Sequence, residues 1–336
     1  MQPGSQTPQL LLRQERFIRK AFTKLPFTLQ IHRNIAQLPV FNNAVITIGT
    51  FDGVHSGHKH ILSQLKAEAL QIQGETVIIT FHPHPRKIVE HTHTVRLLNT
   101  LEEKIALLSK EGIDHLVVIP FDEAFAEQSA EAYIREFLVK RIHPHTIIIG
   151  YDHRFGKDRT GNYLMLEKHA RMLGFTVKEI SEKVLNEVAV SSTRIRKALL
   201  NGDIETANAL LEYDYFFEGK VVEGNKLGRI LGYPTANLAI ENREKLIPGN
   251  GIYAVEVCIE ERRYKGMMSI GFNPTVDGTR LTIEVNIFDF DRDIYHQTIR
   301  VYVKHFLRAE EKFNGLDALK AQLALDKKMA IQKLIR

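Results

Sequence analysis

The first half of the chain alternates short apolar runs with amphipathic stretches. Apolar runs rich in β-branched residues lie at 44–49, 76–81, 116–120, 146–150 and 175–180. Stretches with apolar residues at helical spacing lie at 57–73, 101–110, 130–140 and 163–173. Because nearly continuous apolar strands need cover on both faces, this alternation predicts a Rossmann-like α/β domain with a parallel sheet. Ligands of such sheets bind beyond the carboxyl ends of the strands.

The pattern changes in the second half of the chain. Period-two alternation dominates, as in Leu281–Phe290 and Thr298–Val303, with Gly, Pro and Asn between the runs. This predicts a small antiparallel β-barrel, closed by a terminal helix near Leu316–Leu325. We place the domain boundary at Asn208–Asp214. The chain then divides into an extension at 1–28, an α/β domain at 29–208 and a barrel domain at 209–336.

Composition narrows the class of protein. The net charge of +5 is mildly basic, but the basic residues are scattered and no basic–aromatic stripe is present, so we expect no nucleic-acid partner. A soluble enzyme with phosphate-bearing ligands fits better. The single cysteine, Cys258, lies in an alternating run and is expected to be a core residue in a reducing cytoplasm.

Neither a membrane anchor nor a signal peptide is expected. No apolar run approaches the roughly 18 residues that span a bilayer. Residues 1–28 are polar and basic and lack an apolar signal core. An extension without a catalytic role is favoured for them over an organelle transit peptide.

Two histidines follow the first predicted strand. His55 and His58 lie three residues apart where a strand–turn–helix is expected, and Gly49, Gly53 and Gly57 allow the backbone to approach a ligand closely. Imidazoles beside a helix N-terminus can donate hydrogen bonds to phosphate oxygens, which suits nucleotidyl transfer. The alternatives are helix-capping histidines or half of a metal site.

Two further segments carry polar side chains suited to a nucleotide. Residues 190–197 place Ser191, Ser192 and Thr193 before a helical run that also carries Arg196, which makes either a capped helix or a cradle for a triphosphate. Residues 150–157 follow the fourth strand and include Asp152, either in a nucleotide pocket or in a plain polar loop.

Four histidines lie close together after the second predicted strand. They are His82, His84, His91 and His93. No cysteine or carboxylate spacing accompanies them, so a metal site is disfavoured. Phe81 and His84 are instead candidate pocket residues.

The second half has a glycine-rich segment, 224–238, that ends in the letters PTAN. Thr235 and Asn237 lie two residues apart and face the same way in an extended chain, as two hard oxygen ligands suited to Mg²⁺. The glycines would let backbone N–H groups wrap phosphates; the alternative is a hairpin with turns. Glu284 lies on the polar face of an alternating strand, either as a solvated carboxylate or as a base.

These motifs together resemble the bacterial bifunctional riboflavin kinase/FAD synthetase family. GTFDGVHSGH, GYDHRFG and SSTRIR match three motifs of its FMN adenylyltransferase module in the expected order, and GRILGYPTAN matches its riboflavin kinase module. The resemblance covers about residues 29–326. The sequence departs from the family pattern at Thr50, Asn286 and His296, where asparagine, histidine and glycine are common, and in the linker at 211–215.

The resemblance implies a role for residues in both modules. Catalysis is implied for His55, His58 and, as the base that accepts the riboflavin 5′-hydroxyl proton, Glu284. ATP binding in the adenylyltransferase module is implied for Gly49, Phe51, Gly57, Ser191, Ser192, Thr193 and Arg196. The flavin and nucleotide pockets are implied to include Phe81, His84, Asp152, Asn273 and Thr275. ATP binding in the kinase module is implied for Gly224, Gly228, Gly232 and Arg308, and Mg²⁺ binding for Thr235 and Asn237.

The implied function is the synthesis of flavin cofactors. Riboflavin would be phosphorylated to FMN, and FMN adenylylated to FAD, with ATP as co-substrate and Mg²⁺ as cofactor. The protein is expected to be cytoplasmic, without a nucleic-acid or membrane partner, and a monomer or weak homo-oligomer. The alternatives are a nucleotidyltransferase with another acceptor and a non-catalytic flavin or RNA binder.

Overall fold

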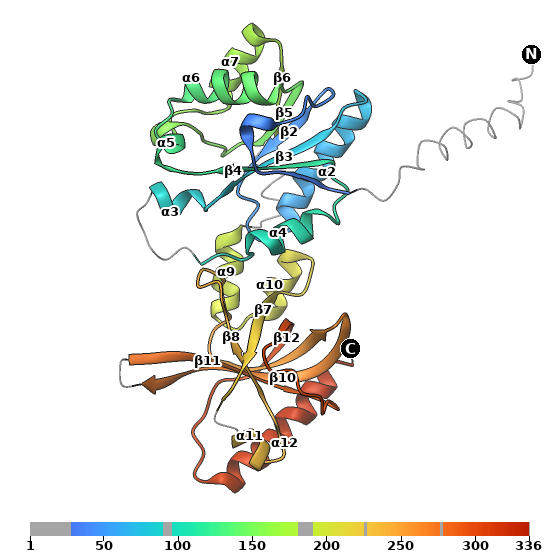
Figure 1. The fold of residues 1–336 in the computed structure, drawn as a ribbon, viewed down its shortest axis with the longest axis vertical. Coiled ribbons are helices and arrows are strands. Elements are labelled where there is room, and N and C mark those ends of the chain that lie inside the picture. Colours follow the sequence, from blue (N-terminus) through green and yellow to red (C-terminus); the bar gives the residue numbers. More distant parts are fainter. Residues whose placement is uncertain (1–27, 90–95, 181–190, 225–226, 276–277, 336) are drawn as a thin grey trace, which may run out of the picture.

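The structure, a computed structural model, describes residues 28–89, 96–180, 191–224, 227–275 and 278–335. An α/β lobe and a barrel lobe lie at opposite ends of the molecule, with helices α9 and α10 between them (Figure 1). The extension expected at 1–28 lies outside the described residues except for Thr28.

The α/β lobe is built on six parallel strands in the order β1-β4-β3-β2-β5-β6. They are β1 (Gln30–His32), β2 (Val45–Ile48), β3 (Thr76–His82), β4 (His115–Pro120), β5 (Thr146–Gly150) and β6 (Thr176–Ile180). Five of these are the predicted strands, which confirms the α/β class. The sequence pattern does not predict β1, because β1 has only three residues, is largely exposed and pairs with β4 at the edge of the sheet.

Helices cover both faces of this sheet. The helices of this lobe are η1 (Ile35–Gln37), α2 (Ser56–Gln71), α3 (Pro85–Val89), α4 (Leu101–Leu108), α5 (Glu123–Ala126), α6 (Ala130–Ala132), η2 (Tyr133–Ile142), η3 (Lys157–Arg159) and α7 (Tyr163–Leu173). Val45 belongs to the apolar cluster with α2 and α4, whereas the next residue, Ile46, belongs to the cluster with η2 and α7. Adjacent residues of one strand are therefore buried on opposite faces, as the continuous apolar runs predicted.

The helix expected at 130–140 begins as predicted but differs in type. After α6, the chain continues through η2 with wider π-type turns, and the His143 N–H donates to the Leu138 carbonyl, five residues back. Such turns are frequent at functional sites, and η2 carries Tyr133 toward the loop after β5.

The second lobe is a closed antiparallel barrel in the order β10-β11-β8-β7-β12-β9. Its strands are β7 (Phe216–Val222), β8 (Ala236–Ala239), β9 (Gly251–Ile259), β10 (Arg262–Thr275), β11 (Gly278–Ile287) and β12 (Thr298–Arg308). The short α11 (Leu227–Ile230) lies between β7 and β8, and α12 (Leu316–Lys333) closes the chain. Both the barrel and the terminal helix are as predicted. Cys258 lies on β9, half-buried, with a free thiol.

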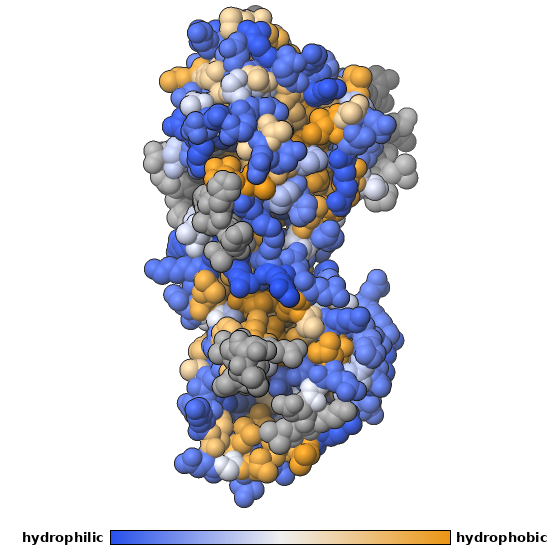
Figure 2. Space-filling view, turned by 60° about the vertical axis from the view of Figure 1, so that its left-hand side comes forward, coloured by the Kyte–Doolittle hydropathy of each residue, from blue (hydrophilic) through white to orange (hydrophobic). Residues whose placement is uncertain are grey.

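Helices α9 (Ser192–Leu200) and α10 (Ile204–Leu211) join the two lobes. Leu199 and Ala207 lie in the same buried apolar cluster as the barrel residues Phe217 and Val255. The packing therefore associates both helices with the barrel, although α9 precedes the boundary placed at 208 and α10 runs across it. Figure 2 shows the molecule narrowing between the lobes. Among the described helices, none combines the length and the apolar character needed to cross a membrane.

Candidate functional site

Two loops that follow neighbouring strands meet at the carboxyl edge of the parallel sheet. The chain runs outward from β2 through β3 to β4 and then returns to the other side of β2 with β5. The loops after β2 and β5 therefore flank a topological switch point, where such sheets bind ligands. The first loop holds Phe51 and Val54 at φ of 48° and 39°. Non-glycine residues in this conformation are strained, and such strain clusters at functional sites.

The two histidines of this loop stack against each other at the start of α2. Their ring centroids lie 3.7 Å apart with 17° between the planes, and Phe51 packs against His58 on another side. His55 is the N-cap of α2, and its Nδ1 accepts a hydrogen bond from the His58 backbone N–H at 3.4 Å. Because Nδ1 of His55 is an acceptor, its proton lies on Nε2, where it can be donated to a ligand.

Burial keeps both histidines uncharged at neutral pH. Burial lowers the pKa of His55 to about 4, against the opposing effect of Asp52, and lowers the pKa of His58 well below its usual range. The His58 Nδ1 is buried and has no hydrogen-bond partner among the described residues. The pair therefore presents neutral imidazole donors beside a helix N-terminus, an arrangement suited to phosphate oxygens.

We expect the protein to lose stability as the pH falls from 7 to 5. Burial also lowers the pKa of His84 to about 4, so His55 and His84 bind protons in the unfolded chain near pH 6.5 but not in the folded chain. The unfolded state then binds more protons, and the free energy of unfolding should fall by on the order of 1 kcal/mol per histidine. Denaturant unfolding at both pH values measures this. His84→Gln should reduce the pH dependence, and an unchanged slope in that variant would contradict the assignment.

Asp52 is a site residue that the sequence pattern did not single out. Its carboxylate is buried and accepts hydrogen bonds from the backbone N–H groups of Leu98 at 3.0 Å and Asn99 at 3.2 Å. It also forms an ion pair with Arg196 of α9. Arg196 is thereby held beside His55, whose pKa it helps to lower. The structure thus brings together the histidine loop and α9, which lie about 140 residues apart.

Lys104 of α4 is a second buried charge that was not predicted. Its Nζ donates to the Thr50 carbonyl at 2.6 Å and approaches the Thr80 hydroxyl at 3.4 Å. Burial lowers the pKa of Lys104 to about 8, and Asp52 opposes that shift. The lysine also helps to lower the pKa of His58 and of His84, so it adds positive charge to the same region.

The hydroxyl residues of α9 lie at its N-terminus. Ser191 is the N-cap and accepts from the Arg194 N–H at 3.2 Å, so the expected capped helix is present. Ser192 donates to the Asp52 carbonyl at 2.9 Å, while Thr193 is exposed. The cap and the contact with the histidine loop coexist, which places the N-terminus of α9 beside that loop.

The predicted pocket residues of this lobe, Phe81, His84 and Asp152, lie around the same edge of the sheet. Phe81 packs edge-on against Phe121 at 5.4 Å, and His84 is half-buried. Asp152 is exposed, whereas the neighbouring His153 stacks near Phe155. His91 and His93, and the side chains of Asn273 and Thr275, lie outside the described residues.

Three buried polar atoms near the loop after β5 have no hydrogen-bond partner among the described residues. They belong to Gln128, Tyr133 and His153. Tyr133 stacks on Phe155, which lies beside His153. Because buried polar groups are nearly always paired, this cluster marks a place where a polar ligand or water can bind.

The second candidate site lies on the barrel. The Thr235 hydroxyl donates to a carboxylate oxygen of Glu284 at 3.1 Å, and Glu284 on β11 is the register partner of Asn237 on β8. The predicted base and the two predicted Mg²⁺ ligands therefore lie together. Asn286, a departure from the family pattern, donates to the Pro234 carbonyl at 2.7 Å and so fixes the PTAN segment.

The glycines of this segment lie where a side chain would collide. A Cβ atom at Gly224 would lie 2.1 Å from the Asn237 amide nitrogen, and one at Gly228 would lie 2.3 Å from the Tyr233 carbonyl oxygen. Gly232 adopts a φ of 83°. The other departure, His296, adopts a φ of 65°, the conformation that glycine takes readily.

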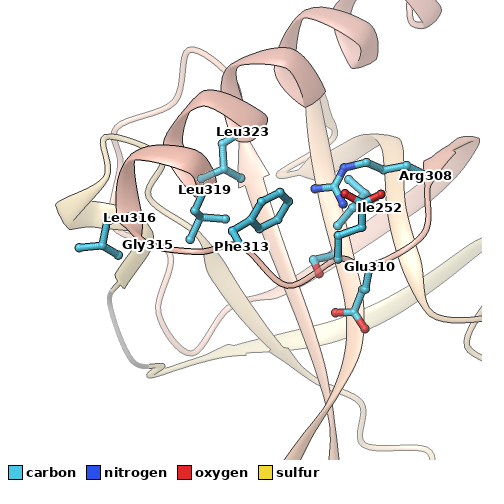
Figure 3. Close-up of a pocket in the computed structure, with 10 residues that line it drawn as sticks. Ile252, Arg308, Glu310, Phe313, Gly315, Leu316, Leu319 and Leu323 are labelled. Atoms are coloured by element: carbon cyan, nitrogen blue, oxygen red, sulfur yellow. The ribbon is translucent and has the colours of Figure 1, made fainter.

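Two adjoining cavities open beside Glu284. One, of about 290 Å³, is lined by Thr235, Glu284 and Asn286. The other, of about 490 Å³, is lined by apolar side chains of α12 and Phe313 before it, and by the charged side chains of Arg308, Glu310 and Glu311. Ile252, Ser269, Leu319 and Leu323 line both. In Figure 3, Leu319 and Leu323 extend from α12 beside Phe313, with Arg308 beyond the ring. The joint cavity is large enough for an aromatic ligand next to a carboxylate.

Arg308, predicted to bind ATP, forms a bidentate ion pair with Asp326 of α12. Its Nε and an Nη donate to the two carboxylate oxygens at 2.9 and 2.7 Å. The Asp326 side chain is fully buried, and Gln322 donates to it as well. The pair fixes α12 against the end of β12 and so forms one wall of the cavity.

We expect Arg308→Met to lower the free energy of unfolding by about 3 kcal/mol, because it leaves the buried Asp326 carboxylate unpaired. Urea denaturation of the variant measures the loss. The double variant Arg308→Met/Asp326→Leu should recover most of the stability, since an apolar pair has no buried charge to compensate. Equal stability of the single variant and the wild-type protein would contradict a structural role for the pair.

The sequence matches two known protein families, one in each lobe. Residues 38–194 match FAD synthetase and residues 211–334 match riboflavin kinase. Bifunctional riboflavin kinase/FMN adenylyltransferases are similar over nearly the whole chain. The Haemophilus influenzae protein is 37% identical, over 85% of this chain and 93% of its own length. The Escherichia coli K12 protein is 36% identical, over 87% of this chain and 93% of its own length. The Listeria monocytogenes protein is 38% identical, over 84% of this chain and 90% of its own length.

The fold is also found among solved structures. A crystal structure from Streptococcus pneumoniae, named as a macrolide-efflux protein, superposes with a TM-score of 0.81 at 32% identity. It covers 90% of this chain and 98% of its own. The two-lobed arrangement is therefore shared over nearly the full length of both proteins.

Proposed function

Because this chain belongs to the family of bifunctional riboflavin kinase/FMN adenylyltransferases, we propose that each of its two sites carries out one of the two reactions. The protein phosphorylates riboflavin to FMN and transfers the adenylyl group of ATP to FMN, giving FAD and pyrophosphate. The observation that carries this conclusion is the match of both lobes to flavin enzymes, over separate segments of one chain.

Adenylyl transfer takes place at the carboxyl edge of the parallel sheet. An oxygen of the FMN phosphate attacks the α-phosphorus of ATP, and the bond to pyrophosphate breaks. His55 and His58 donate hydrogen bonds to the phosphate oxygens where negative charge grows. The N-terminus of α9, with Ser191, Ser192 and Thr193, binds the departing pyrophosphate, and Arg196 adds charge to that side.

ATP and FMN are held by the groups around the histidines. Gly49, Phe51 and Gly57 allow the ATP phosphates to approach the loop and the start of α2. His84 and Phe81 line the pocket at the end of β3, and Asp152 lies at its rim after β5. The unpaired polar atoms near Phe155 mark where the second substrate finds hydrogen-bond partners.

Riboflavin phosphorylation takes place at Glu284. The carboxylate accepts the proton of the riboflavin 5′-hydroxyl while the hydroxyl oxygen attacks the γ-phosphorus of ATP. The bond between the γ-phosphorus and the β-phosphate oxygen breaks, and ADP leaves. The flavin ring lies against the apolar side chains of the cavity beside α12, whose wall includes Arg308, and Asn273 and Thr275 flank it. Gly224, Gly228 and Gly232 allow the ATP phosphates to approach the backbone.

The residues at the kinase site fit a magnesium ion. The Thr235 hydroxyl, the Asn237 amide oxygen and the Glu284 carboxylate are hard oxygen donors within one small region. When bound, Mg²⁺ neutralises phosphate charge during transfer. The Thr235–Glu284 hydrogen bond keeps the hydroxyl and the carboxylate in position for substrate and ion alike.

The partners of the protein are its small-molecule substrates, riboflavin, FMN and ATP. We propose that it works in the cytoplasm as a monomer or weak homo-oligomer, without a nucleic-acid or membrane partner. A reducing compartment suits the free thiol of Cys258.

A product assay tests the proposal directly. Purified protein with riboflavin, ATP and Mg²⁺ should give FMN and then FAD by chromatography, and EDTA should stop both steps. Formation of FMN without FAD would instead favour a different acceptor for the adenylyl group, and the absence of both products would overturn the proposal.

A further inference from the structure

A segment of the barrel lobe pairs with a segment of the α/β lobe. The Leu97 N–H donates to the Glu244 carbonyl at 2.7 Å, and the Leu246 N–H donates to the Leu97 carbonyl at 2.8 Å. Arg96 also donates to the Arg243 carbonyl. The segment 243–246, which lies between β8 and β9, therefore forms a short parallel β-bridge with Leu97 of the adenylyltransferase lobe.

Lys245 lies at the centre of this contact and is almost completely buried. Only 2% of its side chain is exposed. Its Nζ donates to the Leu98 carbonyl at 2.7 Å and to the Glu103 carboxylate at 2.6 Å, and it lies 4.6 Å from the centre of the Tyr215 ring. The Glu103 carboxylate also accepts from the Thr100 N–H in the capping box of α4. One ammonium group thus fixes both ends of the turn 98–103.

The same turn forms part of the adenylyltransferase site. The N–H groups of Leu98 and Asn99 bind the Asp52 carboxylate, and Asp52 holds Arg196. The peptide of Leu98 is therefore bound on its carbonyl side by a lysine of the barrel lobe and on its N–H side by an aspartate of the histidine loop. The Leu98 side chain also fills the space beside Gly53 of that loop.

We propose that Lys245, contributed by the kinase half of the chain, is a positioning residue for adenylyl transfer in the other half. It fixes the turn that orients Asp52, and through Asp52 it orients Arg196 toward the ATP phosphates. A buried ion pair contributes little net stability compared with an apolar pair of similar volume. The position of the Lys245–Glu103 pair at the turn that binds Asp52 is explained instead by a role in orienting Asp52. This inference rests on the adenylyl-transfer function proposed above.

Lys245→Met tests it, because methionine keeps the apolar length and removes the three donors. We expect the KM for ATP in the conversion of FMN to FAD to rise, or kcat to fall, by about 10- to 100-fold, as when a binding group shifts by about an ångström. Phosphorylation of riboflavin by the same preparation should stay within about twofold. Lys245→Arg should recover most of the lost adenylyl transfer, because it can donate to both acceptors.

Lys87→Met is the matched control. Lys87 forms a more exposed ion pair with Glu244, the neighbour of Lys245, so this variant removes a charge from the same interface without touching the turn. It should leave both activities near those of the wild-type protein. Parallel loss of both activities in Lys245→Met, or unchanged adenylyl transfer, would overturn the inference. The wild-type assay separately decides whether the protein makes FAD at all.

Discussion

Glu284→Gln is expected to reduce the phosphorylation of riboflavin by about 10²- to 10⁴-fold, the usual contribution of a general base. Glutamine keeps the size of the side chain and can still accept from the Thr235 hydroxyl, but it cannot take the proton of the attacking hydroxyl. The apolar cavity and the glycine segment remain, so riboflavin and ATP should still bind. Steady-state rates of FMN formation measure the effect.

The same variant should still convert supplied FMN to FAD at the wild-type rate, because Glu284 lies on β11 of the barrel, outside the adenylyltransferase lobe. Glu256→Gln is the matched control, since Glu256 is a carboxylate of another barrel strand, β9, that pairs with Arg263 on the surface. It should leave both reactions unchanged. A Glu284 variant that loses both activities, or neither, would contradict separate sites.

His58→Ala is expected to have the reverse selectivity. It removes an imidazole that is stacked on His55 and placed to donate to the phosphate oxygens, so adenylyl transfer should fall by about 10²- to 10³-fold, as when a transition-state donor is removed. Phosphorylation of riboflavin should be retained. Rates of FAD formation from FMN and ATP, measured at saturating substrate, test this.

His60→Ala controls for effects on helix α2. His60 lies on the same helix, where it forms a hydrogen bond with Gln64, outside the stacked pair. The control should keep both activities. If the two histidine variants behaved alike, the loss would reflect the stability of α2 rather than the chemistry of His58.

Local patterns predicted most of the architecture. Five strands of the parallel sheet and the closed barrel follow from apolar runs and from period-two alternation, because each pattern reports which faces of a strand are buried. The proximity of Thr235, Asn237 and Glu284 could also be expected, since the family resemblance implies that all three belong to one riboflavin kinase site. The three-residue β1 has too few residues to carry a pattern.

The buried charges could not be predicted from the sequence. Asp52, Lys104 and Lys245 look like ordinary surface residues in the chain, and each gains its partners only when distant segments pack together. Arg308 illustrates the same limit, because nothing in the sequence of α12 marks its partner Asp326 among the charged residues of that helix. The signal that could have drawn attention to Asp52 is its place inside the histidine loop, between Phe51 and Gly53.

The shared packing of α9 and α10 with the barrel bears on how this chain could be divided. A cut at residue 208 would separate Leu211 from Leu199 and Ala207, with which it shares a buried cluster. A chain that ended at residue 208 would therefore expose apolar side chains of α9 and α10 that the barrel covers in the whole protein. Placing the two activities on separate polypeptides would require polar residues at these positions of α9 and α10, because the barrel would no longer cover them.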